Sequence, residues 1–298
     1  MKMGKIAVGT DFSEPSNLAV TQAMHLARHL GAEVVLVHAG TIAEHQESHF
    51  GAHSQDVDGW RDKVFAHNRK ELEDFRVRLA GQGVEVSQAF HEGLPGKALC
   101  HAATELGADM IVVGSHSFSG ITRFLLGNVA ERVIKSSKQS VLVARSAGQA
   151  GGFRRILVPL DLEQNSDTAI EMALALASEN GEIELFHCWQ LPHSYAESWM
   201  PGVAASLQEI RDGVSARVRD KLRALSMEHS KPEFKITFEE TDASPREGIV
   251  KRLEYIDYDL VVVASSGRSG LDRWVLGSVS EATARHAPCS VLVVKNKP

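Results

Sequence analysis

The chain has 298 residues, of which 43% are hydrophobic and 23% are charged, and its formal net charge is −6. These values are typical of globular proteins and exclude a disordered chain or a fibrous repeat, and this length usually corresponds to two domains. Because Lys and Arg form no run and no apolar stretch reaches about 18 residues, we expect neither nucleic acid nor a membrane as a partner. Three cysteines without a CxxC pair and the lack of an apolar leader favour a reducing, cytoplasmic location.

The second half of the sequence repeats the first. Identical residues recur at a shift of 150 positions near both ends of each half: Ile6 and Ile156, Val8 and Val158, Asp11 and Asp161, Asp109 and Asp259, Gly127 and Gly277, Glu131 and Glu281. The small, flexible run at 146–152 joins the two copies. We therefore predict two tandem domains, residues 1–146 and 153–298.

In the first half, short apolar runs alternate with longer amphipathic segments, which is typical of a parallel sheet covered by helices on both faces. The predicted strands are Ile6–Thr10, Glu33–His38, Val84–Phe90, Met110–Gly114 and Ser140–Ala144. The predicted helices are Ser16–Leu30, Asp58–Ala80, Lys97–Leu106 and Val129–Ser136. Gly31 follows the first helix and is expected to be its left-handed cap.

The second half has the same pattern. Its predicted strands are Ile156–Leu160, Ile183–His187, Lys235–Glu240, Leu260–Ala264 and Ser290–Val294. Its predicted helices are Ser166–Glu179, Ala204–His229, Arg246–Tyr255 and Val279–His286. Each half is thus predicted to be an open, twisted, five-stranded parallel sheet of Rossmann-like type. The fifth strands are strongly apolar and would be a liability as exposed edges, so we expect the two halves to cover them within one chain as an internal pseudo-dimer, with a homodimer of chains left open.

Ligands of open parallel sheets bind beyond the carboxyl ends of the strands, where the strand order reverses. In the second half, Ala264 ends the fourth strand, Gly267 lies in the loop that follows, and Gly277 precedes the last helix. A helix N-terminus favours a phosphate group, because it presents N–H groups and a partial positive charge. Ser278 and Glu281 fit a capping box, so an ordinary capped helix behind a flexible loop is the alternative.

These residues resemble the nucleotide loop of the universal stress protein family, whose ATP-binding members carry Gly, two residues, Gly, nine residues, then Gly-Ser or Gly-Thr. The second half has Ala264, Gly267 and Gly277-Ser278 at these positions, and the first half has Gly114, Ser117 and Gly127-Asn128. The resemblance covers nearly the whole chain. It implies two domains of the adenine nucleotide alpha hydrolase-like fold and ATP, with or without Mg²⁺, as the ligand.

By the same resemblance, Pro159 and Asp161 would contact the adenine or ribose, as Asp11 would in the first half. A turn or a helix start is the alternative role of these aspartates. Other residues would line the phosphates, mostly through backbone N–H groups. In the second half these are Ala264, Gly267, Arg268, Gly277, Ser278 and Val279, and in the first half they are Gly114, Gly127 and Asn128.

The two loops differ. Ser117 replaces the loop glycine of the first half, where a left-handed conformation would cost about 1–2 kcal/mol and weaken binding by about an order of magnitude. Asn128 can still cap a helix, and Glu131 would complete its capping box. We therefore hypothesise that the second half is the better ATP site.

The resemblance implies a stress-response protein whose bound nucleotide alters its contacts with protein partners of unknown identity. A nucleotide-independent interaction scaffold and a weak ATPase are the alternatives. No residue is predicted to be catalytic, because no general base, arginine finger or dedicated Mg²⁺ carboxylate is evident. We also expect no metal site at His45, His49 and His53, since Gly51 interrupts the helix that would align them.

Overall fold

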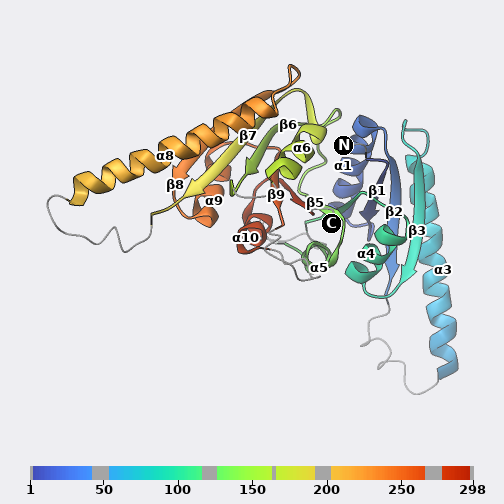
Figure 1. Cartoon of the computed structure of the whole chain (residues 1–298). Helices are drawn as coiled ribbons and strands as arrows, with labels where there is room; N and C mark the ends of the chain where they lie inside the picture. The colour runs from blue at the N-terminus through green and yellow to red at the C-terminus, as the bar shows by residue number, and fades with distance from the viewer. Residues whose placement is uncertain are drawn as a thin grey trace. The chain divides into compact units, whose positions relative to one another are not determined.

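The computed structural model describes residues 3–41, 54–115, 126–162, 166–191, 203–265 and 277–295, without the side chains of 54–58 and 203–206. The chain folds as two compact units that divide between Gly151 and Gly152. Each unit is an α/β domain with a parallel sheet, as predicted (Figure 1). We retain 1–146 and 153–298 as proposed domain boundaries, and the pseudo-dimer stays a prediction.

The first domain contains a parallel sheet with the strand order β3-β2-β1-β4-β5. Its strands are β1 (Lys5–Gly9), β2 (Glu33–Gly40), β3 (Val86–Glu92), β4 (Met110–Gly114) and β5 (Ser140–Ala144). Its helices are α1 (Glu14–Leu30), α3 (Ser54–Leu79), α4 (Pro95–Glu105) and α5 (Asn128–Ser136). The chain runs outward from β1 to β3 and then returns to β4, so the strand order reverses between β1 and β4.

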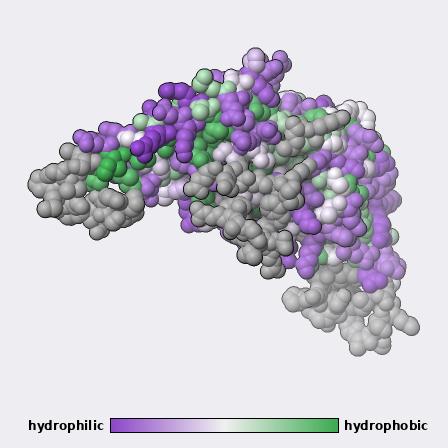
Figure 2. Space-filling view, viewed as in Figure 1, coloured by the Kyte–Doolittle hydropathy of each residue, from purple (hydrophilic) through white to green (hydrophobic). Residues whose placement is uncertain are grey.

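This reversal places helices on both faces of the sheet. Crossovers between parallel strands are right-handed, so α1 and α3 cover one face while α4 and α5 cover the other. The contacts agree, because α1 packs on β1 and β4, α3 packs on β2 and β3, and α4 packs against α5. Strand β1 is consequently buried from both sides, and Ile6, Ala7 and Val8 have no exposed surface. Figure 2 shows mainly hydrophilic residues over α3, whose apolar side chains Phe65 and Leu72 are buried.

The second domain repeats this arrangement, with the strand order β10-β9-β6-β7-β8. Its strands are β6 (Phe153–Pro159), β7 (Ala177–Trp189), β8 (Lys235–Asp242), β9 (Leu260–Ala264) and β10 (Ser290–Val294). Its helices are α6 (Ser166–Leu176), α8 (Val203–Glu228), α9 (Pro245–Tyr255) and α10 (Ser278–His286). By the same rule α6 and α8 cover one face, and α9 and α10, which pack together, cover the other.

Local backbone geometry explains where the predicted bounds hold and where they differ. Gly31 has a φ of 68° and is the left-handed cap of α1, as predicted. The predicted helix to Glu179 is too long, because α6 ends at Leu176 and Ala177 pairs with Phe153 at the start of β7. Asn180 then has a φ of 60°, which a right-handed helix cannot contain.

Within the described part of the chain, no helix combines the length and the apolar character needed to cross a bilayer.

Candidate functional site

The reversal of strand order in the second domain lies between β6 and β9, the two strands that carry predicted ligand residues. Pro159 ends β6, and Asp161 follows it as an exposed residue. Ala264 ends β9, which pairs with β6 in parallel. The structure therefore brings Pro159, Asp161 and Ala264 to the same edge of the sheet, where open α/β sheets bind their ligands.

Helix α10 begins beside this edge. Ser280 donates a hydrogen bond from its hydroxyl to the carbonyl oxygen of Ala264, at 2.8 Å, and so fixes the start of α10 against the end of β9. The first bond within the helix runs from the Glu281 N–H to the Gly277 carbonyl, at 2.9 Å. The N–H groups of Ser278 and Val279 thus precede the intrahelical ladder and carry the partial positive charge of the helix start.

The predicted capping box of α10 is wrong. Gly277 is the N-cap, with a φ of −65° and a ψ of 152°, and Ser278 is already the first helical residue. Glu281 therefore lies one position too far along the helix to close a box, and its carboxylate pairs with Arg285 at 3.2 Å. Because the cap is glycine, it places no side chain of its own at the start of the helix.

The capping box of the first domain is wrong for the same reason. Gly127 is the N-cap of α5, with a φ of −69°, and Asn128 is its first helical residue rather than its cap. Glu131 forms an ion pair with Lys135 at 2.7 Å. The Gly127 N–H differs from its counterpart, because it donates to the carbonyl oxygen of Ser115 at 2.6 Å. No described residue accepts a hydrogen bond from the Gly277 N–H.

Sequence reasoning missed two serines at the site of the second domain. Ser280 is buried and holds α10 to β9, whereas the first domain has Ala130 at the corresponding position. Ser265 follows β9 and is only 2% exposed, and its hydroxyl has no hydrogen-bond partner among the described residues, although its N–H donates to the Val294 carbonyl. For Ser265 the available signal was a hydroxyl directly after the apolar run 260–264, whereas the polar sequence around Ser280 gave no such signal.

The predicted site residues of the first domain have structural roles of their own. Asp11 accepts hydrogen bonds from the N–H and the hydroxyl of Ser13, the N-cap of α1, which is a contact of the helix-start kind, and its ligand role stays a prediction. A Cβ atom on Gly114 would lie 2.7 Å from the Pro15 carbonyl oxygen. The close approach of α1 to the end of β4 therefore requires glycine at this position. Ala264 carries a methyl group at the equivalent position of the second domain.

A histidine lies two residues before the end of the second strand of each domain and contacts the residue that follows the first strand. His187 Nδ1 lies 2.7 Å from the Leu160 carbonyl oxygen, and His38 Nδ1 lies 2.8 Å from that of Thr10. A carbonyl oxygen only accepts, so Nδ1 carries the proton and Nε2 is left as an acceptor in the neutral ring. Next to His187, burial raises the pKa of the Cys188 thiol to about 12, so this thiol is neutral.

Several predicted residues cannot be placed. Gly267, Arg268 and Ser117 lie outside the described residues, as does the histidine series at 45, 49 and 53. Among the residues that are described, no group of three His, Cys, Asp or Glu side chains could hold a metal ion.

The duplication seen in the fold is also found in comparisons with known families. The model of the universal stress protein family matches residues 3–145 and again residues 152–295. The chain belongs to the universal stress protein family. It consists of two universal stress protein domains in tandem, as the resemblance implied.

Relatives match either one domain or the whole chain. Universal stress protein YxiE of Bacillus subtilis is 31% identical over 151 residues, which are 47% of this chain and 98% of YxiE. A universal stress protein of Mycolicibacterium smegmatis is 25% identical over 297 residues, which are 97% of this chain and 96% of that protein. The crystal structure of a universal stress protein from Archaeoglobus fulgidus covers 100% of both chains with a TM-score of 0.67 and 21% identity, which shows the shared fold.

Proposed function

We propose that this universal stress protein binds ATP in its second domain, at the carboxyl ends of β6 and β9, and that the bound nucleotide regulates its contacts with protein partners. Pro159 and Asp161 would contact the adenine or ribose. The start of α10 would bind the phosphates through backbone N–H groups, with Mg²⁺ held mainly by the phosphates themselves.

The observation that carries the proposal is the conformation of Gly277. Its φ of −65° is one that any residue adopts, so the backbone does not require glycine there. Glycine at such a position is favoured when a ligand must approach the backbone closely. Gly277 also offers an N–H group that no described residue binds, at the end of a helix that attracts anions.

The buried hydroxyl of Ser265 supports the same location. A hydroxyl that is 2% exposed and that no described residue pairs with is costly, and a polar ligand would remove that cost by accepting its hydrogen bond. Ser265 directly follows Ala264, whose carbonyl holds the start of α10. The unpaired hydroxyl and the open helix start thus belong to one edge of the domain.

The first domain is the weaker site in this proposal. The N–H group of Gly127 is already bound by Ser115, so the start of α5 has one donor fewer for a phosphate. Ala130 also provides no hydroxyl to hold α5 against the end of β4. These differences add to the replacement of the loop glycine by Ser117.

The proposal is tested by denaturing the purified full chain and identifying released nucleotide, followed by calorimetric titration with ATP. We expect about one strong site per chain. Gly277→Glu places a carboxylate at the helix start and should abolish strong binding, whereas the matched change Gly127→Glu in the first domain should leave it intact. Both glycines have ordinary φ values, so either variant can fold.

The alternatives give different results. Absence of ATP binding by a folded wild-type chain would favour the nucleotide-independent scaffold. Loss of binding in Gly127→Glu alone would place the site in the first domain. Phosphate release that disappears in Gly277→Glu would identify a weak ATPase, and no release during prolonged incubation would leave ATP as a regulatory ligand.

A further inference from the structure

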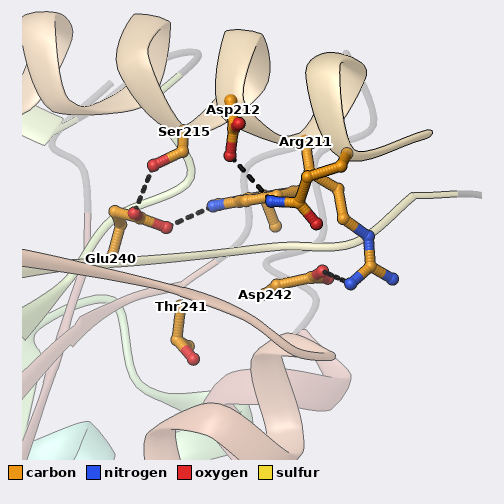
Figure 3. Close-up of a pocket in the computed structure, with 8 residues that line it drawn as sticks. Arg211, Asp212, Ser215, Glu240, Thr241 and Asp242 are labelled. Atoms are coloured by element: carbon orange, nitrogen blue, oxygen red, sulfur yellow. Dashed lines mark hydrogen bonds and ion pairs between the residues drawn. The ribbon is translucent and has the colours of Figure 1, made fainter. Parts of the chain in front are cut away.

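The second domain has a polar groove that shares no lining residue with the proposed nucleotide site. It lies between α8 and the ends of β7 and β8 and has a volume of about 340 Å³, at the lower end of the size of small-molecule sites (Figure 3). Six side chains carry the argument: Trp189 of β7, Arg211, Asp212 and Ser215 of α8, and Glu240 and Asp242 of β8. Because side chains alternate along a strand, Glu240 and Asp242 both face α8.

The corresponding position of the first domain is filled. At a shift of 150 residues, Phe65 corresponds to Ser215 and Phe90 to Glu240, and the two phenyl rings pack edge to face with centroids 5.5 Å apart. Gly40 takes the place of Trp189, and a Cβ atom on it would lie 2.5 Å from Phe90. This position therefore belongs to the apolar core in the first domain, whereas in the second domain it is an open polar groove.

Hydrogen bonds hold the floor of the groove rigidly. The Glu240 carboxylate accepts from the Ser215 hydroxyl at 2.6 Å, from Arg219 at 3.3 Å and from the Trp189 indole N–H. Burial alone would raise the pKa of Glu240, but these hydrogen bonds together outweigh it and lower the pKa. Glu240 is thus a fixed carboxylate, and it fixes the indole ring of Trp189 as one wall.

The charges of the groove select the kind of ligand. Arg219 compensates Glu240, and Arg211 compensates Asp242 at 3.3 Å. Asp212 is different, because in the described chain its only hydrogen bond or ion pair is with the neutral amide of Gln208, at 2.9 Å. The groove therefore has, on its exposed side, one carboxylate that no described cation compensates, and Trp189 lines the same groove.

We propose that this groove binds a small organic cation with an ammonium or guanidinium group. The cation would pair with the Asp212 carboxylate and lie against the indole of Trp189, since both interactions favour such groups. Arginines already pair with Glu240 and Asp242, so the carboxylate of Asp212 is the charge left to a ligand, and an apolar molecule would leave its hydrogen-bonding capacity unused. The site is therefore chemically unlike the proposed phosphate site at the start of α10.

Agmatine, which carries both cationic groups, is a suitable probe, with butylurea as a neutral molecule of similar shape. Calorimetry or NMR titration of the full chain at low ionic strength should show one saturable agmatine site and no comparable butylurea binding. Asp212→Asn should weaken agmatine binding about tenfold, the loss expected for one charge-assisted hydrogen bond. Asp62→Asn, the matched change on α3, should leave it unchanged.

A second variant tests the groove itself. Ser215→Phe introduces the phenyl ring that fills the first domain, and we expect it to abolish agmatine binding. Gly277→Glu should retain agmatine binding, which separates this proposal from that of the ATP site. The proposal is overturned by a wild-type chain without saturable agmatine binding, by equal binding in Asp212→Asn, or by loss of binding in Gly277→Glu.

Discussion

A buried ion pair in the second domain gives a quantitative test of how the two copies are stabilised. Arg252 of α9 forms two hydrogen bonds with Glu184 of β7, both at 2.8 Å, and contacts the Tyr258 hydroxyl at 3.3 Å. The Glu184 side chain is 5% exposed and that of Arg252 is 27% exposed. Glu184 accordingly keeps the pKa of Arg252 above its usual value, while burial raises the pKa of Tyr258.

Arg252→Ala should be strongly destabilising, because it leaves the buried Glu184 carboxylate without its cation. Breaking a buried pair in this way costs about 3–5 kcal/mol, and we expect about 3 kcal/mol because Arg252 is partly exposed. This value corresponds to a more than hundredfold increase in the equilibrium for opening of the domain.

The first domain provides the control, since Val35 and Ala102 occupy the positions of Glu184 and Arg252. The double change Glu184→Val with Arg252→Ala removes both charges and should cost only about 1 kcal/mol, mainly for the unpaired hydroxyl of Tyr258. Hydrogen exchange followed by mass spectrometry measures both variants, with peptides of the first domain as an internal reference. Equal destabilisation by the single and the double change would refute this reasoning.

Three further predictions follow from single contacts. Gly114→Ala should destabilise the first domain by about 1–3 kcal/mol in hydrogen exchange, because the new Cβ would be 2.7 Å from the Pro15 carbonyl oxygen. The matched change Ala264→Gly should alter the stability of the second domain by less than about 1 kcal/mol. The pKa of Glu240 is lowered in the folded chain, so its stabilising contribution is complete above the unfolded pKa of 4.5 and is lost as the pH falls below that value. Glu240→Gln removes this contribution and should flatten the acid side of a stability profile measured by denaturant unfolding. Nitrogen NMR of His187 should show a protonated Nδ1 and a bare Nε2 at alkaline pH, and the opposite tautomer would contradict the hydrogen bond to Leu160.

Much of the fold could be predicted from the sequence because the apolar runs of a doubly covered parallel sheet are continuous. Strands such as Met110–Gly114 and Leu260–Ala264 have the predicted bounds. The end of α6 could not be predicted, because it depends on pairing of Ala177 with Phe153 and on the positive φ of Asn180. Strand pairing of this kind is a tertiary contact that a local pattern does not contain.

The candidate site could be predicted in part. The motif located the end of β9 and the start of α10, but it placed the helix cap one residue too late, at Ser278 instead of Gly277. Cap positions depend on backbone angles, and the sequence Gly-Ser-x-x-Glu allows either residue to be the cap. The roles of Ser265 and Ser280 depend on burial, which the short polar residues themselves do not indicate.

The difference between the two copies is the central feature of the account. Both domains keep the sheet, the histidine near the end of the second strand, and glycine as the N-cap of the last helix. In the first domain, however, the Gly127 N–H donates a hydrogen bond to the Ser115 carbonyl, and phenyl rings occupy the position of the polar groove. These differences favour the second domain as the part of the chain that binds ligands.

Calorimetric titration of the full chain with ATP, in wild type and in the matched variants Gly277→Glu and Gly127→Glu, tests this asymmetry most directly. The account predicts one strong site per chain that Gly277→Glu abolishes and Gly127→Glu preserves. Two sites of equal affinity, or a single site that Gly127→Glu abolishes, would contradict it.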